Sequence, residues 1–215
     1  MLFRFMPDTQ KQRKQRKTHA ERRDEIAQTA LQLAAERGAA AVSTQAIADH
    51  MGVSQATVFR HFKTRNDVFS EAIALVSRSV MEALGPIFAD KSTPAAERLQ
   101  RLVHAHLAFV QSNSGIPALV FSDTLHQGAP ELKAQVRQLM KAYAGRVAGL
   151  LVEGVEDGSV HADADPALLA QTVVTLVQGV VLRWSLFDGS FDLETQADVI
   201  WAVLRPALAA PSPNA

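Results

Sequence analysis

Side chains between residues 43 and 65 include types that proteins use to read nucleic acid. Gln55 can pair with the edge of an adenine, and Arg60 can pair with guanine or phosphate. Thr57 can contact a base or the methyl group of thymine. These side chains follow one another closely, so one short element could present all of them. The pattern therefore indicates a surface that hydrogen-bonds to double-stranded DNA.

Two short helices joined by a tight turn are predicted to hold these side chains. Ser43 or Thr44 caps the first helix, and Ser54 caps the second, which runs to about His61. Gly52 lies in the turn, as in a helix-turn-helix motif. The apolar side chains predicted to form the small shared core of the motif are Ile47, Met51, Val53, Val58 and Phe62.

The face of the second helix opposite Val58 is predicted to enter the major groove, led by its N-terminus. We expect the DNA contacts to come from Thr44, Ser54, Gln55, Ala56, Thr57, Phe59, Arg60, His61, Lys63 and Arg65. Thr44, Lys63 and Arg65 are better placed for phosphates than for bases. His61 lies nearer the buried side, so packing with a backbone contact is at least as strong an interpretation as base reading.

This stretch resembles the TetR/AcrR family of repressors. The residues that carry the resemblance are Thr44, Ile47-Ala48, Gly52-Val53-Ser54, Val58-Phe59, His61-Phe62-Lys63, Arg65 and Asp67-Val68-Phe69. Their order, spacing and position in the chain all agree with the family pattern. The resemblance covers about residues 22–75 in detail and the remainder only in its pattern of helices. Taken without it, an ordinary helical hairpin is the alternative interpretation of the two short helices.

The sequence departs from the family pattern at Phe59. The family usually has a tyrosine there, whose hydroxyl touches a phosphate. Phe59 can still pack and meet a thymine methyl group, but that hydrogen bond is lost. Arg60 beside it could take over the phosphate contact.

The chain has no net charge, but its charges are unevenly distributed. Residues 1–65 carry 12 Lys or Arg against 6 Asp or Glu, and residues 66–215 carry 10 against 16. This division suggests a basic module for a polyanion attached to an acidic body, with chance segregation as the alternative. The charge block at 11–17 indicates a disordered basic arm over residues 1–17, which could also follow phosphates or enter a minor groove.

The composition also excludes several classes of protein. The chain has no cysteine, which rules out a disulfide framework, a thiolate zinc site and a cysteine nucleophile. No run of 18 apolar residues occurs, so no membrane span is expected. We expect a cytoplasmic, nucleoid-associated protein.

Apolar residues recur at helical spacing, and no alternating strand pattern appears, so the predicted fold is all-α with about nine helices. Residues 18–65 are expected to form a three-helix DNA-binding domain, and residues 66–209 a larger helical ligand-binding and dimerisation domain, followed by a disordered tail at 210–215. Thr64 opens a long helix that Gly85-Pro86 should bend or end. A single short helix is expected over residues 117–125.

The family resemblance implies that the larger domain binds a ligand and forms a dimer through its last two helices. The very apolar segment 168–187 supports a dimer independently, although a buried core helix is an equal alternative. The side chains assigned to the dimer interface are Val173, Leu176, Val177, Val180, Trp201 and Leu204. Those assigned to the ligand pocket are His106, Phe109, Phe121, His126, Tyr143 and Trp184, although core packing is the commoner role for each.

The sequence thus predicts a dimeric repressor that a small, mostly apolar ligand releases from a palindromic operator, with no cofactor and no membrane partner. An enzyme is disfavoured because no phosphate loop, dinucleotide motif or zincin motif is present. His104 and His106 point to different faces of a helix, and a surface hydrogen bond is the more common role for the Asp123–His126 pair. The other alternative is a DNA-binding protein without a ligand, acting architecturally or through a protein partner.

Overall fold

A computed structural model describes residues 17–209, apart from the side chains of His126 and Gln127. The basic arm predicted before Lys17 and the predicted tail at 210–215 lie outside the described residues. Within 17–209 the chain is all-α, as predicted, and contains no strand. The helices are α1 His19–Arg37, a 3₁₀ turn Ala39–Ala41, α2 Thr44–Met51, α3 Gln55–Phe59, α4 Arg65–Ala89, α5 Ala95–Gln111, α6 Gly115–Val120, α7 Asp123–Gly128, α8 Pro130–Glu156, α9 Pro166–Leu186 and α10 Leu193–Leu208.

Helix starts follow the capping residues in the sequence. Thr18 caps α1 in a full capping box with Glu21, and Thr64 caps α4 in the same way with Asp67. Ser43, rather than Thr44, accepts the capping hydrogen bond of α2. These caps satisfy backbone N–H groups that would otherwise lack partners, and so fix where each helix begins.

Two helix ends differ from what was expected. Of the bend or end expected at Gly85-Pro86, the end does not occur, since α4 continues to Ala89 with Ile87 buried in the core. Residues 117–125 do not form one helix. The chain leaves α6 at Phe121, and Ser122 accepts from the backbone N–H of Leu125 to start α7.

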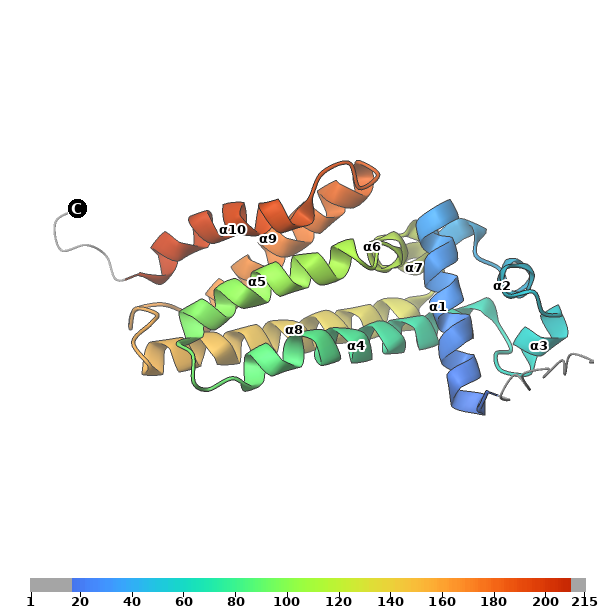
Figure 1. Cartoon of the computed structure of the whole chain (residues 1–215), viewed down its shortest axis with the longest axis horizontal. Helices are drawn as coiled ribbons and strands as arrows, with labels where there is room; N and C mark the ends of the chain where they lie inside the picture. The colour runs from blue at the N-terminus through green and yellow to red at the C-terminus, as the bar shows by residue number, and fades with distance from the viewer. Residues whose placement is uncertain (1–16, 210–215) are drawn as a thin grey trace, which may run out of the picture.

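The molecule is elongated, with the α1–α3 unit at one end of its long axis (Figure 1). α4, α5 and α8 run along the body, and α1 lies across their end, in contact with α4 and α6. α9 packs on α8, and α10 packs on α5 and α9, which places the α9–α10 pair along one outer side (Figure 1). The α1–α3 unit and the C-terminal end of α10 therefore lie far apart (Figure 1).

The hydrophobic core has two parts. The larger one joins α4, α5, α8, α9 and α10. The smaller one contains the α1–α3 core and also includes Leu119, Val120, Leu125, Leu132 and Val136 from α6 to α8. The core of the α1–α3 unit therefore continues into residues of the body.

By length and composition alone, α4 and α9 are apolar enough to cross a membrane. This is a weak indication, because the core helices of soluble proteins pass the same test. One face of α4 packs against α1, α5 and α8, while Arg78 and Glu82 are exposed on its outer side. In this structure α4 is therefore a helix packed on one side and polar on the other.

Candidate DNA-binding surface and effector cavity

The residues predicted to contact DNA run from Thr44 at the start of α2 to Arg65 at the start of α4, and the α1–α3 unit lies at one end of the molecule (Figure 1). Ser54, Ala56, Phe59, Arg60 and Lys63 are exposed, and Phe59 is 47% exposed although it is a large apolar side chain. Beneath them, Ile47, Val58 and Phe62 are buried, and Met51 and Val53 pack against this core. The motif core predicted from the sequence is confirmed.

The turn between the two helices depends on Gly52. Its φ is 65°, in the left-handed region, where other residues are strained. Its N–H donates to the carbonyl of Asp49, so the turn closes α2 directly. This geometry sets the angle at which α3 leaves α2.

A small polar network links the reading residues to one another. The Gln55 amide donates to the Thr44 hydroxyl at 3.0 Å, and the Ser54 and Thr57 hydroxyls lie 3.0 Å apart. Arg60 reaches Thr57 at 3.4 Å. These contacts hold the polar groups in a common orientation, and each group can exchange its partner for a base or a phosphate.

Two of the residues predicted to contact DNA make contacts within the protein instead. Arg65 donates to the carbonyl of Ala39 at 2.6 Å and lies 4.8 Å from the centre of the Phe69 ring. Partial burial lowers the pKa of its guanidinium group. Arg65 thus links α4 to the segment after α1. The nitrogen that donates to Ala39 is not free for the phosphate contact expected from the sequence.

His61 is the second such residue. Its ring lies 4.5 Å from the ring of His19, and burial together with the neighbouring positive charges of His19 and Arg60 lowers its pKa. Its carbonyl accepts a hydrogen bond from Arg23 at 2.8 Å. These contacts favour the packing role weighed for His61.

Sequence reasoning missed Arg23, which joins three elements. It lies 4.2 Å from the centre of the Phe62 ring, donates to the carbonyl of His61 and pairs with Glu71 on α4. No local pattern marks such a residue, because Glu71 is 48 positions away in the chain. Arg23 fixes the end of the reading motif against α1 and α4.

A cavity of about 100 Å³ lies inside the body, between α4, α5, α6, α8 and α9. Its lining is almost entirely apolar and consists of Val80, His106, Val120, Phe121, Val136, Leu139, Met140, Tyr143, Val177, Gln178 and Val181. Three of the predicted pocket residues, His106, Phe121 and Tyr143, are brought together here. Throughout, we call this space the effector cavity.

His106 and Tyr143 form a hydrogen-bonded pair in this apolar lining, with 2.9 Å between Nδ1 and the phenol oxygen. If Tyr143 donates to Nδ1, the Nε2–H of His106 remains available, and if Nδ1 donates, the Tyr143 hydroxyl does. In either tautomer the pair keeps one N–H or O–H donor for a further acceptor. Burial lowers the pKa of His106 to about 4 and raises that of Tyr143, so both are neutral at pH 7.

Desolvation of this histidine should make stability depend on pH. The unfolded chain binds a proton at His106 below pH 6.5, whereas the folded chain resists it until about pH 4, so stability falls as pH drops through that window. Between pH 7.5 and pH 5, the wild type should lose about 1–2 kcal/mol more than His106→Gln. Urea unfolding at both pH values measures the difference. Equal losses would show that His106 keeps an ordinary pKa.

The other predicted pocket residues lie elsewhere. Phe109 lines a different cleft, next to α1. Trp184 is buried in the core of the body, with its ring 3.2 Å from the position that a Cβ on Gly189 would take, and it does not line the effector cavity. The side chain of His126 lies outside the described residues. The sequence alone did not distinguish these positions for Trp184, because a buried tryptophan and a pocket tryptophan have the same sequence pattern.

The residues predicted for the dimer interface divide into two groups. Val173, Val177 and Leu204 are buried inside the protomer, so they do not form an outer face. Leu176, Val180 and Trp201 are half-buried. The exposed large apolar side chains of α9 and α10 are instead Leu168, Leu182, Leu186, Val199 and Val203. Helical spacing identified the apolar helices but not which of their faces the protomer itself covers.

Comparison with known proteins agrees with this arrangement. Residues 26–72 match the family model "Bacterial regulatory proteins, tetR family", and residues 92–208 match "Tetracyclin repressor-like, C-terminal domain". The nucleoid occlusion factor SlmA of Vibrio campbellii is 26% identical over 184 residues, which cover 85% of this chain and 93% of that protein.

Two solved structures have the same fold. The fatty acid degradation regulator FadR from Bacillus halodurans matches with a TM-score of 0.76 and 25% identity, over 90% of this chain and 98% of that one. The regulator FadR from Bacillus subtilis, solved in complex with stearoyl-CoA, matches with a TM-score of 0.72 and 22% identity, over 86% of this chain and 99% of that one.

An all-helical body carrying a helix-turn-helix at one end defines a DNA-binding transcriptional regulator. The chain belongs to the TetR family of bacterial regulatory proteins. The family resemblance found in the sequence is confirmed.

Proposed function

We propose that this regulator is a dimeric repressor that reads a palindromic operator through α3 and leaves it when a long-chain acyl thioester binds in the effector cavity. The observation that carries the ligand part is the hydrogen-bonded pair His106 and Tyr143, in a lining whose other side chains are apolar except for Gln178. We place the protein in the cytoplasm, on the nucleoid. Residues 18–65 act as the reading domain and residues 66–209 as the sensing and dimerising domain.

On the DNA side, the exposed residues of α3 are assigned to the major groove. Ser54, Gln55, Ala56 and Thr57 lead into the groove, and Phe59 packs against a thymine methyl group or the sugar. Arg60 is assigned to a guanine edge, and Thr44 and Lys63 to phosphates.

Arg60→Ala should weaken operator binding by about 1–3 kcal/mol and relax specificity at one base position, because a guanine contact is lost. Fluorescence anisotropy on operator and on random duplexes measures both effects. An equal loss on the two duplexes would place Arg60 on phosphate instead.

Lys63→Ala should weaken binding to every duplex by a similar factor, because its exposed ammonium group is assigned to a phosphate. The slope of log K against log salt should become shallower by about one. An unchanged slope would contradict this assignment. Lys141→Ala, an exposed lysine on α8, serves as the charge-matched control.

The ligand class rests on the effector cavity and on one relative. The Bacillus subtilis regulator holds stearoyl-CoA, and an acyl chain would suit the aliphatic side chains of Val80, Leu139 and Val181. The free donor of the His106–Tyr143 pair would bond to the thioester carbonyl. The Gln178 carboxamide is the other polar group in the lining and could bond to the same ligand.

A cavity of about 100 Å³ is too small for a long acyl chain, because three or four water molecules already occupy that volume. The ligand must therefore bind a wider arrangement of the surrounding helices and shift the population towards it. Val120 and Val136 line the cavity and also belong to the core of the reading unit. Widening at these residues would move the reading heads of the dimer relative to each other.

The experiment measures release of operator DNA by palmitoyl-CoA, with coenzyme A as the matched control. We expect release by the acyl thioester and none by coenzyme A. Met140→Trp should bind the operator normally but fail to respond, because the larger ring fills the cavity. Failure of acyl-CoA compounds of every chain length to release the wild type would refute the ligand assignment.

A second candidate function is DNA binding that depends on a protein partner. The small volume of the effector cavity favours it, as does the similarity to SlmA, a nucleoid occlusion factor. The release experiment separates the two functions, since a partner-driven protein stays on its operator whatever acyl compound is added.

A further inference from the structure

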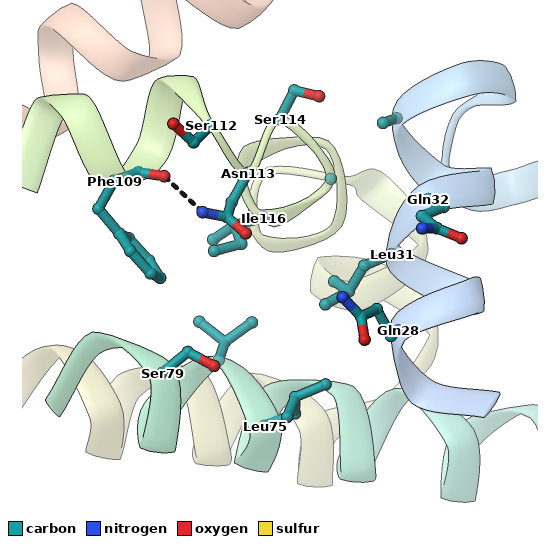
Figure 2. A pocket seen from close by; sticks show the side chains of 13 residues that line it. Gln28, Leu31, Gln32, Leu75, Ser79, Phe109, Ser112, Asn113, Ser114 and Ile116 are labelled. Atoms are coloured by element: carbon teal, nitrogen blue, oxygen red, sulfur yellow. Dashed lines mark hydrogen bonds between the residues drawn. The ribbon is translucent and has the colours of Figure 1, made fainter. Parts of the chain in front are cut away.

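A second cleft lies where the reading unit meets the body (Figure 2). Its volume is about 280 Å³, and α1, α4, α5 and the start of α6 line it. It shares no lining residue with the effector cavity. Throughout, we call it the junction cleft. Its volume is near the lower end of small-molecule sites, which span roughly 300–1,000 Å³.

The junction cleft has two kinds of wall. Leu31, Leu75, Phe109 and Ile116 provide apolar surface, and the ring of Phe109 points from α5 into the space (Figure 2). Polar side chains form the rim, namely Gln28, Gln32, Ser79, Ser112, Asn113 and Ser114. The same elements supply both kinds of side chain, with Leu31 and Gln28 on α1 and Leu75 and Ser79 on α4, so an occupant that meets both must be amphipathic.

No lining residue of the junction cleft carries a charge. An ionised ligand would lose hydration there without gaining an opposite charge, which is unfavourable. The Asn113 amide is held by its bond to the carbonyl of Phe109, at 2.7 Å, so one hydrogen-bonding group of the rim is already oriented (Figure 2). Amides and hydroxyls pair best with other neutral hydrogen-bonding groups.

The position of the junction cleft couples it to DNA binding. Gln28 and Leu31 belong to α1 of the reading unit, whereas Phe109 and Ile116 belong to the body. The two sides meet at Gly115, whose backbone packs directly on that of Leu31. A ligand that contacts both sides binds most tightly at one relative position of the reading unit and the body. Its binding therefore stabilises that position.

We propose that the junction cleft is a second effector site, which binds a small uncharged molecule with an aromatic or branched apolar group and a carboxamide or hydroxyl head. Its occupancy changes operator affinity by fixing α1 against α5 and α6. This site is independent of the acyl ligand proposed for the effector cavity.

The absence of cysteine from the chain allows a direct test of the coupling. Ser79→Cys places one thiol in the cleft, and benzyl methanethiosulfonate then fills it with an aromatic ring. Labelling should change operator affinity by about 5- to 150-fold, the usual range for coupled sites. Ala83→Cys, exposed one turn further along α4, should keep its affinity within twofold after the same labelling. Mass spectrometry confirms full labelling of both.

A second measurement tests the ligand class on the wild-type dimer. Phenylacetamide should shift the amide NMR signals of Leu31, Phe109 and Ile116 at millimolar concentration, and phenylacetate, which has the same shape and a negative charge, should not. Fully labelled Ser79→Cys with unchanged operator affinity would overturn the coupling. Equal binding of the amide and the carboxylate would overturn the ligand class.

Discussion

Gly115→Ala is expected to destabilise the protein by about 3 kcal/mol and to loosen the reading unit from the body. A Cβ on Gly115 would lie 2.1 Å from the carbonyl oxygen of Leu31 and 2.7 Å from its carbonyl carbon. Overpacking usually costs about 1–3 kcal/mol when side chains can rearrange, and here the obstacle is backbone, so α1 and α6 must separate. Urea unfolding measures the stability, and hydrogen exchange in α1 measures the loosening.

Gly149→Ala is the matched control for this substitution. Gly149 is exposed within α8, and no atom lies within 4 Å of where its Cβ would be. The alanine should therefore leave stability unchanged or raise it by up to about 1 kcal/mol, as expected in a helix interior. A Gly115→Ala protein as stable as Gly149→Ala would show that the close contact between α1 and α6 does not exist in solution.

Val203→Glu is expected to convert the proposed dimer into a monomer and to reduce operator affinity by about 10²- to 10⁴-fold. Val199 and Val203 are 57% and 62% exposed and lie one turn apart on α10, and α9, which packs on α10, exposes Leu182 and Leu186. Burying a carboxylate in this apolar face is unfavourable. Without the dimer, the two reading heads no longer bind one operator together, which removes the gain from linking them.

Sedimentation analysis and operator titration measure these two effects on the same sample. The protomer itself should stay folded, because position 203 is exposed within it. Ala142→Glu, on an exposed position of α8, is the control and should remain dimeric. A dimeric Val203→Glu protein with normal operator affinity would exclude this face from the interface.

The helices and the reading motif could be predicted because their signals are local. Thr18 with Glu21 and Thr64 with Asp67 mark helix starts within four residues, and Gly52 marks the turn by its conformational freedom. The exposed positions of α3 follow from helical periodicity alone.

The rest of the fold and of the candidate site could not be predicted from the sequence, because it depends on contacts between residues far apart in the chain. Val173 and Val177 have the pattern of an interface, but the fold uses their faces for its own core. Arg65 has the charge of a phosphate contact, yet the carbonyl of Ala39 lies within its reach. Gly115 gave no sequence signal, because only the approach of α1 makes its missing side chain necessary.

Selection of bound sequences from random DNA, by the purified protein at near-physiological salt, tests the central claim most directly. A symmetric dimer that reads DNA through α3 should recover a palindrome of two half-sites, about one to one and a half helical turns apart. Arg60→Ala should recover the same palindrome with one position relaxed in each half-site. Recovery of no motif, with binding that only weakens with salt, would contradict an operator-reading dimer.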